Sequence, residues 1–233
     1  MAFVLWLFEI GYMFQHVATF FQILKMLKKN NSELVSFETN VLFLIGAFSR
    51  IGWMWDSMLK SFFLAYLEVL IAIGTLSYVI YLHQVNKVRN YYSNEIILPH
   101  YLKLYTLIPV VFVLSFLFNP GSSFFSSQVF VSLGIFSEAF GLLPQLFMII
   151  KSKDTGDLSE MYIVFLGIAR FFRLIFWIKM YMDGSKFLSL VIADLAHCVA
   201  LSNFIYNVVM NWSGKGLPTS FTELNTKSNK KMF

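Results

Sequence analysis

Long apolar runs alternate with short polar stretches along the whole chain. A helix that crosses the hydrocarbon core of a bilayer needs about 20 mainly apolar residues. Seven runs approach this length, and the connections between them are too short to hold a soluble domain. The pattern therefore predicts seven membrane-spanning helices, at residues 3–24, 39–55, 60–82, 103–119, 127–150, 160–182 and 187–211.

Turn-forming residues fall between these runs. The sequence NPGSS at 119–123 and the Asp-Gly pair at 183–184 are both typical of turns. The run at 39–55 is the weakest, because it is short and contains Arg50. We expect one all-α, seven-helix transmembrane domain at residues 1–212 and a polar, lysine-rich tail at residues 213–233.

The composition agrees with a membrane protein. Hydrophobic residues make up 58% of the 233 residues and charged residues only 13%, against roughly 25% charged residues in a soluble domain. A soluble enzyme domain is therefore excluded. The 27 Phe residues exclude a disordered chain, and the single cysteine, Cys198, excludes a disulfide scaffold.

The net charge of +5 comes from basic residues whose distribution predicts the orientation of the protein in the membrane. Of the 18 Lys and Arg residues, twelve lie on one side of the predicted spans, two (Lys60 and Lys186) on the other and four inside the spans. The positive-inside rule makes the side with twelve cytosolic, or matrix in a mitochondrion, so the amino terminus is expected in the lumen. No aromatic and basic motif supports nucleic-acid binding. The twelve residues are Lys25, Lys28, Lys29, Lys87, Arg89, Lys103, Lys151, Lys153, Lys215, Lys227, Lys230 and Lys231.

Several ionisable residues lie inside the predicted spans, where an unpaired charge is costly. Arg170, Arg173 and Trp177 share one helix face by their spacing, and that face must look into the bundle. Glu138 and Asp194 are the expected partners of the two arginines. Such pairs either lock helices together or line a polar interior. Other ionisable residues in the spans include Arg50, Glu68, Lys179, His16 and His197.

Two further features of the spans bear on function. His16 is either a hydrogen-bonded structural residue or a group that changes charge between neutral and mildly acidic compartments. Pro144-Gln145 lies in the middle of the fifth span, where a proline frees backbone carbonyls. No metal-ligand spacing, phosphate loop or nucleophile elbow is present, so the sequence predicts no enzyme, metal or cofactor.

The stretch from Glu138 to Gly184 contains PQLFMI at 144–149 with Glu138 upstream, and FLG at 165–167 with Arg170 three residues later. This combination resembles the ER lumen protein-retaining (KDEL/HDEL) receptor family. A looser likeness runs through the chain, at His16 and Arg50 among other positions. It implies seven helices arranged as two inverted three-helix bundles joined by a linker helix, a fold related to PQ-loop and SWEET transporters.

The resemblance also implies a function. Receptors of this family bind the C-terminal tetrapeptide of escaped ER proteins, tightly in the acidic Golgi and weakly in the neutral ER, and recruit a vesicle coat through a cytosolic tail. Here Arg50 would take the ligand carboxylate and His16 would sense protons. The other ligand-binding positions implied are Glu138, Arg170, Trp177 and Lys179, and the tail ends in a dilysine, Lys230 and Lys231.

Departures from the family pattern keep other functions open. One alternative is a structural subunit of a larger membrane assembly, for example in the mitochondrial inner membrane, in contact with lipids and partner subunits rather than a peptide. A second alternative is a SWEET-like carrier of small solutes. The departures lie at Glu9, Trp53, Gln128, Ala169, Arg173, Phe176 and Asn203.

Overall fold

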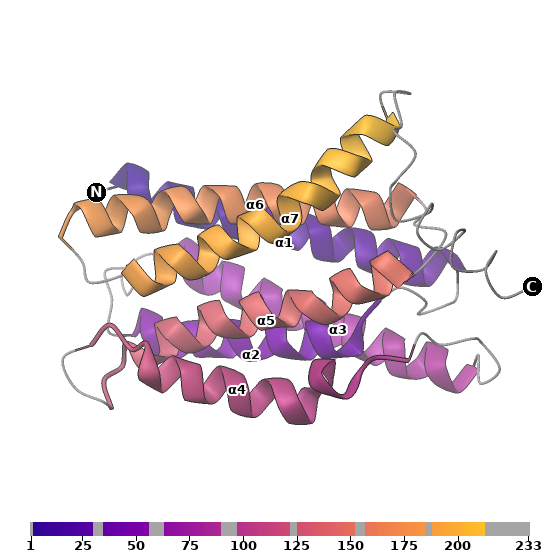
Figure 1. Ribbon diagram of the computed structural model, residues 1–233, viewed down its shortest axis with the longest axis horizontal. Helices are drawn as coiled ribbons and strands as arrows, with labels where there is room; N and C mark the ends of the chain where they lie inside the picture. Colours follow the sequence, from indigo (N-terminus) through magenta and orange to yellow (C-terminus); the bar gives the residue numbers. More distant parts are fainter. Residues whose placement is uncertain are drawn as a thin grey trace, which may run out of the picture.

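A computed structural model shows the protein as a bundle of α-helices (Figure 1). The structure describes residues 2–29, 35–55, 63–89, 97–121, 125–151, 157–184 and 188–212. Each predicted span coincides with one helix, so the all-α prediction is confirmed. The elements are α1 (Ala2–Lys29), α2 (Phe37–Met54), α3 (Phe63–Arg89), the short 3-10 helix η2 (His100–Leu102), α4 (Leu104–Leu117), α5 (Val129–Lys151), α6 (Asp157–Met182) and α7 (Leu188–Trp212).

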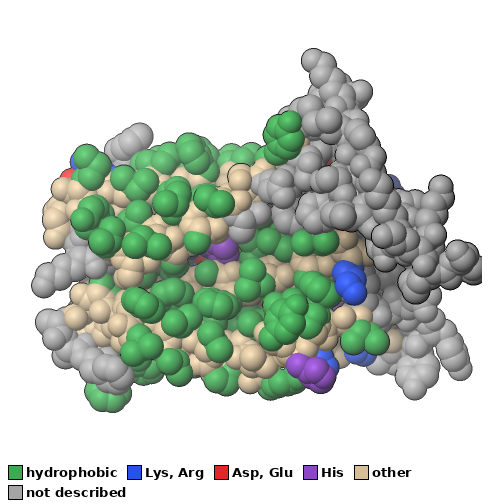
Figure 2. All heavy atoms as spheres, in the orientation of Figure 1, with side chains coloured by type: hydrophobic (Ala, Val, Ile, Leu, Met, Phe, Trp, Pro, Cys, Tyr) green, Lys and Arg blue, Asp and Glu red, His purple; other side chains and the backbone are tan. Residues whose placement is uncertain are grey.

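The apolar helices are those of a membrane protein. Within the described ranges, three segments are both long and apolar enough to cross a bilayer: Phe63–Lys87, Val129–Lys151 and Leu158–Met182. Leu104–Leu117 and Leu188–Val199 are apolar but shorter. Hydrophobic side chains cover most of the helix length on the face in Figure 2, and the Lys and Arg side chains visible there lie toward the ends. Seven crossings remain a prediction.

The helices pair in a regular way. The most extensive contacts join α1 to α6 and α2 to α5, while α3 packs on both α1 and α2, and α7 packs on α6 and, to a lesser extent, α5. Helix α4 packs on α5 at the lower edge of the view in Figure 1. The contacts have an internal symmetry in which α1, α2 and α3 are equivalent to α5, α6 and α7. The contact of α1 with α6 corresponds to that of α5 with α2, and the contacts of α3 with α1 and α2 correspond to those of α7 with α5 and α6.

Small residues bring α2 and α5 close together. A Cβ atom built on Gly46 would lie 3.0 Å from the Ser137 Oγ, and one on Gly134 would lie 2.9 Å from the Ser49 Oγ. Small residues commonly mark close helix contacts in membranes. This approach carries the α5 side chains, including Glu138, into the centre of the bundle.

Local signals end α4 and α6 close to the predicted turns, whereas α1 and α3 continue to Lys29 and Arg89, beyond their predicted ends at 24 and 82. The Asp183 N–H donates to the Lys179 carbonyl over 3.0 Å, and Gly184 follows at φ 91°, a conformation that favours glycine. The predicted turn at 183–184 is thus confirmed. Of the predicted turn at 119–123, the described part has the Gly121 N–H donating to the Asn119 Oδ1 over 2.9 Å.

Basic residues gather at one end of the bundle. Lys28, Lys87, Lys103 and Lys151 lie at helix ends that meet on the right of Figure 1. The prediction for Lys25 was wrong in one respect: it lies within α1 and is buried, and its Nζ donates to the Ser159 Oγ over 2.7 Å. The tail, with Lys230 and Lys231, lies outside the described residues.

Candidate functional site

One cluster of charged side chains joins α1, α2 and α3, and we call it the Arg50 cluster (Arg50, Glu68 and His16). One carboxylate oxygen of Glu68 accepts a hydrogen bond from the Arg50 Nη1 over 2.6 Å, and the other lies 2.6 Å from the His16 Nε2. Arg50 and Glu68 are buried, whereas the His16 side chain is 14% exposed. Glu68 therefore bridges two basic groups from two different helices.

A second cluster joins α5, α6 and α7, and we call it the Glu138 cluster (Glu138, Arg170, Arg173 and Asp194). The Arg170 Nη1 donates to the Glu138 Oε2 over 2.8 Å, and the Arg173 Nη1 donates to the same oxygen. The Asp194 Oδ1 lies 3.7 Å from the Arg170 Nη1 and 3.8 Å from the Arg173 Nη2. None of the four side chains is more than 1% exposed. The pairing predicted from the sequence is confirmed.

Tyr12 on α1 connects the two clusters. The Arg50 Cζ lies 3.6 Å from the centroid of the Tyr12 ring, and the Arg173 Cζ lies 4.6 Å from it. Attraction between guanidinium groups and an aromatic face is strongest where water is excluded, and Tyr12 is buried. Gln15, one turn later on α1, accepts a hydrogen bond from the Arg173 Nη1 over 3.4 Å.

Large aromatic side chains fill the space beside Tyr12. The Phe8 ring centroid lies 4.8 Å from that of Phe176 and 5.7 Å from that of Trp53, and Trp53 lies 6.2 Å from Trp177. All four side chains are buried. We call these residues the aromatic block. It joins α1, α2 and α6, and it contains Trp53 and Phe176, two of the positions where the sequence led us to expect a departure from the family pattern.

Not every predicted site residue belongs to these clusters. Lys179 is about half exposed near the end of α6, and its Nζ lies 2.9 Å from the Asp183 Oδ1. His197 lies at the edge of the Glu138 cluster: its Nδ1 is 4.0 Å from the Asp194 Oδ1, and its Nε2 is 2.8 Å from the Ala139 carbonyl oxygen. Glu9 is buried, although its position near the start of α1 gave no sign of this. The sequence analysis also did not predict that Glu68 bridges Arg50 and His16. The available signal was the presence of an acidic residue inside a predicted span.

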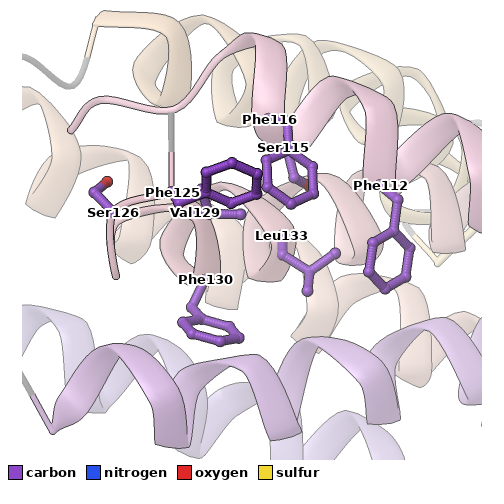
Figure 3. Close-up of a pocket in the computed structure, with 8 residues that line it drawn as sticks. All are labelled: Phe112, Ser115, Phe116, Phe125, Ser126, Val129, Phe130 and Leu133. Carbon is purple, nitrogen blue, oxygen red and sulfur yellow. The ribbon is translucent and has the colours of Figure 1, made fainter. Parts of the chain in front are cut away.

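A cavity of about 210 Å³ lies apart from both clusters, between α4 and the start of α5 (Figure 3). Its two hydroxyl groups are already used: the Ser115 Oγ donates to the Val111 carbonyl, and the Ser126 Oγ donates to the Asn119 Oδ1. It therefore presents apolar surface and no charge, and it is not suited to a carboxylate. The lining residues are Phe112, Ser115, Phe116, Phe125, Ser126, Val129, Phe130 and Leu133.

No group of three or more metal-ligating side chains occurs in the part of the chain that the structure describes. The two clusters and the Tyr12 ring between them consist instead of arginines, carboxylates, a histidine and a tyrosine. Groups of this kind bind or neutralise charge, and a planar guanidinium is suited to a carboxylate because it can donate two parallel hydrogen bonds.

Comparison with known protein families identifies a family to which the chain is similar. The family model for the ER lumen protein retaining receptor matches residues 31–180, well over half of the chain. The chain belongs to this receptor family. The matched segment contains Arg50, Glu138, Arg170, Trp177 and Lys179, whereas His16 precedes it.

Individual receptors of the family show the same relationship. The ER lumen protein-retaining receptor of Kluyveromyces lactis is 27% identical over 205 residues, which is 85% of this chain and 90% of that protein. The receptor of Caenorhabditis briggsae is 26% identical over 82% of this chain and 86% of its own. ER lumen protein-retaining receptor 2 of Gallus gallus is 35% identical over 101 residues, 43% of this chain and 47% of its own. The likeness is distant and extends over most of the chain.

Proposed function

We propose that the chain is a divergent, non-catalytic retention receptor that binds a C-terminal retrieval signal and returns its bearer from the Golgi to the ER. The observation that carries this proposal is the Arg50 cluster. Among the described core arginines, Arg170 and Arg173 are fully buried, whereas Arg50 belongs to a cluster that reaches the surface through His16. Arg50 also lies four residues from the end of α2, about 6 Å along the helix axis.

In this proposal each residue has a separate role. Arg50 binds the terminal carboxylate of the signal, and His16 is the proton sensor, because histidine is the residue type that can change charge between neutral and mildly acidic compartments. Glu138, Arg170 and Trp177 form the interior against which the signal packs, and Lys179 contacts the signal from the exposed end of α6. The burial of the first three and the exposure of Lys179 support this division.

The proposal includes an architecture and a location. The contact pattern, which is preserved when α1, α2 and α3 are exchanged for α5, α6 and α7, supports two three-helix bundles with α4 as linker. Helices α1 and α5 both begin at the left end of Figure 1, so the contacts favour a parallel repeat over the inverted arrangement that the resemblance implies. The basic residues at one end of the bundle support a cytosolic face there and a lumenal amino terminus. In the ER and Golgi, the dilysine Lys230-Lys231 would then be read by the retrograde vesicle coat.

Peptide binding to the purified full chain tests the receptor function. We expect peptides with a C-terminal HDEL-like sequence to bind more tightly at about pH 5.5 than at about pH 7.4. Amidating the peptide terminus should remove binding, because the peptide then offers no carboxylate to Arg50. The matched variant Arg50→Gln should lose binding of the free acid. A chain that binds no such peptide at either pH is not this kind of receptor.

A second candidate is a structural subunit of a larger membrane assembly, such as one in the mitochondrial inner membrane. The aromatic block favours it, because its side chains fill the space beside the Tyr12 ring, which covers Arg50, and a peptide would need that space. The closed pairing of the Glu138 cluster favours it as well. Stable co-purification with partner subunits, inner-membrane fractionation and no peptide binding would together support this function over the receptor.

A further inference from the structure

Glu68 occupies the place on Arg50 that a ligand carboxylate would need. Its Oε2 accepts from the Arg50 Nη1 over 2.6 Å, and it approaches from α3, five residues after that helix begins. Among the described residues, Glu68 is the one carboxylate in hydrogen-bond contact with Arg50. The Tyr12 ring lies 3.6 Å from the Arg50 Cζ, so one face of the guanidinium is covered as well.

Glu68 holds Arg50 with one oxygen only. Its other oxygen is turned to the His16 Nε2 at 2.6 Å, and the Arg50 Nε has no hydrogen-bond partner. An arginine binds a carboxylate most strongly through two parallel hydrogen bonds. The contact with Glu68 therefore leaves the Nε–H of Arg50 without an acceptor. A carboxylate that is free to orient itself could accept hydrogen bonds from two N–H groups of the guanidinium.

His16 offers Glu68 a second partner. If an external carboxylate took Arg50, Glu68 would keep its contact with the His16 Nε2 and would not become an isolated buried charge, which is the costly outcome for a broken buried pair. The other charged or titratable groups close to the Arg50–Glu68 pair are Glu9 and Tyr12 on α1 and Glu138 on α5. Arg173 on α6 also lies against the Tyr12 ring.

We propose that Glu68 is a built-in competitor: it occupies Arg50 in the unliganded protein, and an external carboxylate binds by displacing it onto His16. This inference rests on the proposed function for the identity of the natural ligand, a peptide with a free C-terminus. It adds a residue that sets affinity. It also explains how an arginine so far inside the bundle is kept paired when no ligand is bound.

Acetate tests the site without any peptide. Glu68→Ala removes the internal carboxylate and leaves room beside Arg50, so we expect acetate, but not chloride, to raise the melting temperature of this variant in detergent. A rise of about 2–4 °C is expected at acetate concentrations several times its Kd. The wild-type protein and the matched control Asp183→Ala, which breaks an exposed pair, should show no such rise. Equal responses of all three proteins, or none in Glu68→Ala, would overturn the inference.

Peptide binding to Glu68→Gln tests the competition itself, and this variant keeps the shape of the side chain if Glu68→Ala fails to fold. We expect the free-acid peptide to bind Glu68→Gln roughly tenfold more tightly than wild type, with no gain for the amidated peptide. Equal binding of the free-acid peptide to both proteins would contradict the competitor role of Glu68 without contradicting the receptor function. If no peptide binds either protein, the receptor function fails and the acetate result alone decides on Glu68.

Discussion

Glu138 neutralises two arginines with a single oxygen. Arg170 and Arg173 both donate to its Oε2, while Asp194 stays at 3.7 Å or more from either guanidinium. A buried charge that loses its partner is strongly destabilising, because the desolvation cost remains when the attraction is gone. At the scale of single residues, the stability of the core therefore depends on this carboxylate.

We expect Glu138→Gln to lower the free energy of unfolding by about 3–5 kcal/mol. The substitution keeps the side-chain shape and removes the charge, leaving two buried arginines with Asp194 alone. Thermal or denaturant unfolding in detergent measures the loss. Asp183→Asn is the matched control, since its pair with Lys179 is half exposed and such pairs contribute about 0–1 kcal/mol. Equal stability of the two variants would contradict the role given to Glu138.

Residue spacing was enough to predict the Glu138 cluster. Arg170 and Arg173 are three positions apart on one helix, so one face carries both, and acids in neighbouring spans were the available partners. The Arg50 cluster could not be predicted in this way. Arg50, Glu68 and His16 come from three helices, and spacing along a chain says nothing about which faces of different helices meet.

At the scale of elements, Gly11 lets α1 approach α6. A Cβ atom at this position would lie 2.8 Å from the Arg173 Cγ and 3.0 Å from the Ala169 carbonyl oxygen. Neither atom can move easily, because Arg173 is held by Glu138 and the carbonyl belongs to a helix. The absence of a side chain at Gly11 therefore gives Arg173 its room.

We expect Gly11→Ala to destabilise the protein by about 1–3 kcal/mol, the usual cost of overpacking. Gly74→Ala on α3 is the matched control, because a Cβ atom there meets nothing within 4 Å. Alanine is a better helix former than glycine, so the control should be neutral or more stable by up to about 1 kcal/mol. Unfolding of both variants in one detergent makes the comparison, and a Gly11→Ala protein as stable as wild type would refute the close contact.

At the scale of the whole molecule, the distribution of basic residues predicts which end faces the cytosol. Lys28, Lys87, Lys103 and Lys151 lie at helix ends on the same side of the bundle. Positively charged residues next to spans are retained on the cytosolic side. Because α1 begins at the opposite end, the amino terminus should lie in the lumen.

Glycosylation acceptor sites appended at either terminus on a polar spacer test this orientation, because only lumenal sites acquire the glycan. We expect the amino-terminal site to be modified in cells and the carboxy-terminal site to stay unmodified, together with ER and Golgi staining. Modification at the carboxy terminus would reverse the orientation. No modification at either end, with recovery in mitochondria, would favour the structural subunit.

The sequence by itself determined the class of protein, the seven helices and the paired charges of α5, α6 and α7. These depend on local properties, namely the length of apolar runs, the helical period and the cost of a charge in an apolar span. Only the tertiary structure decided that Glu68 bridges Arg50 and His16, that Tyr12 joins the two clusters, and that Lys179 stands outside both. These contacts depend on which helix faces meet. Which faces meet is decided by side-chain packing between residues far apart in the chain, and local sequence patterns do not specify that packing.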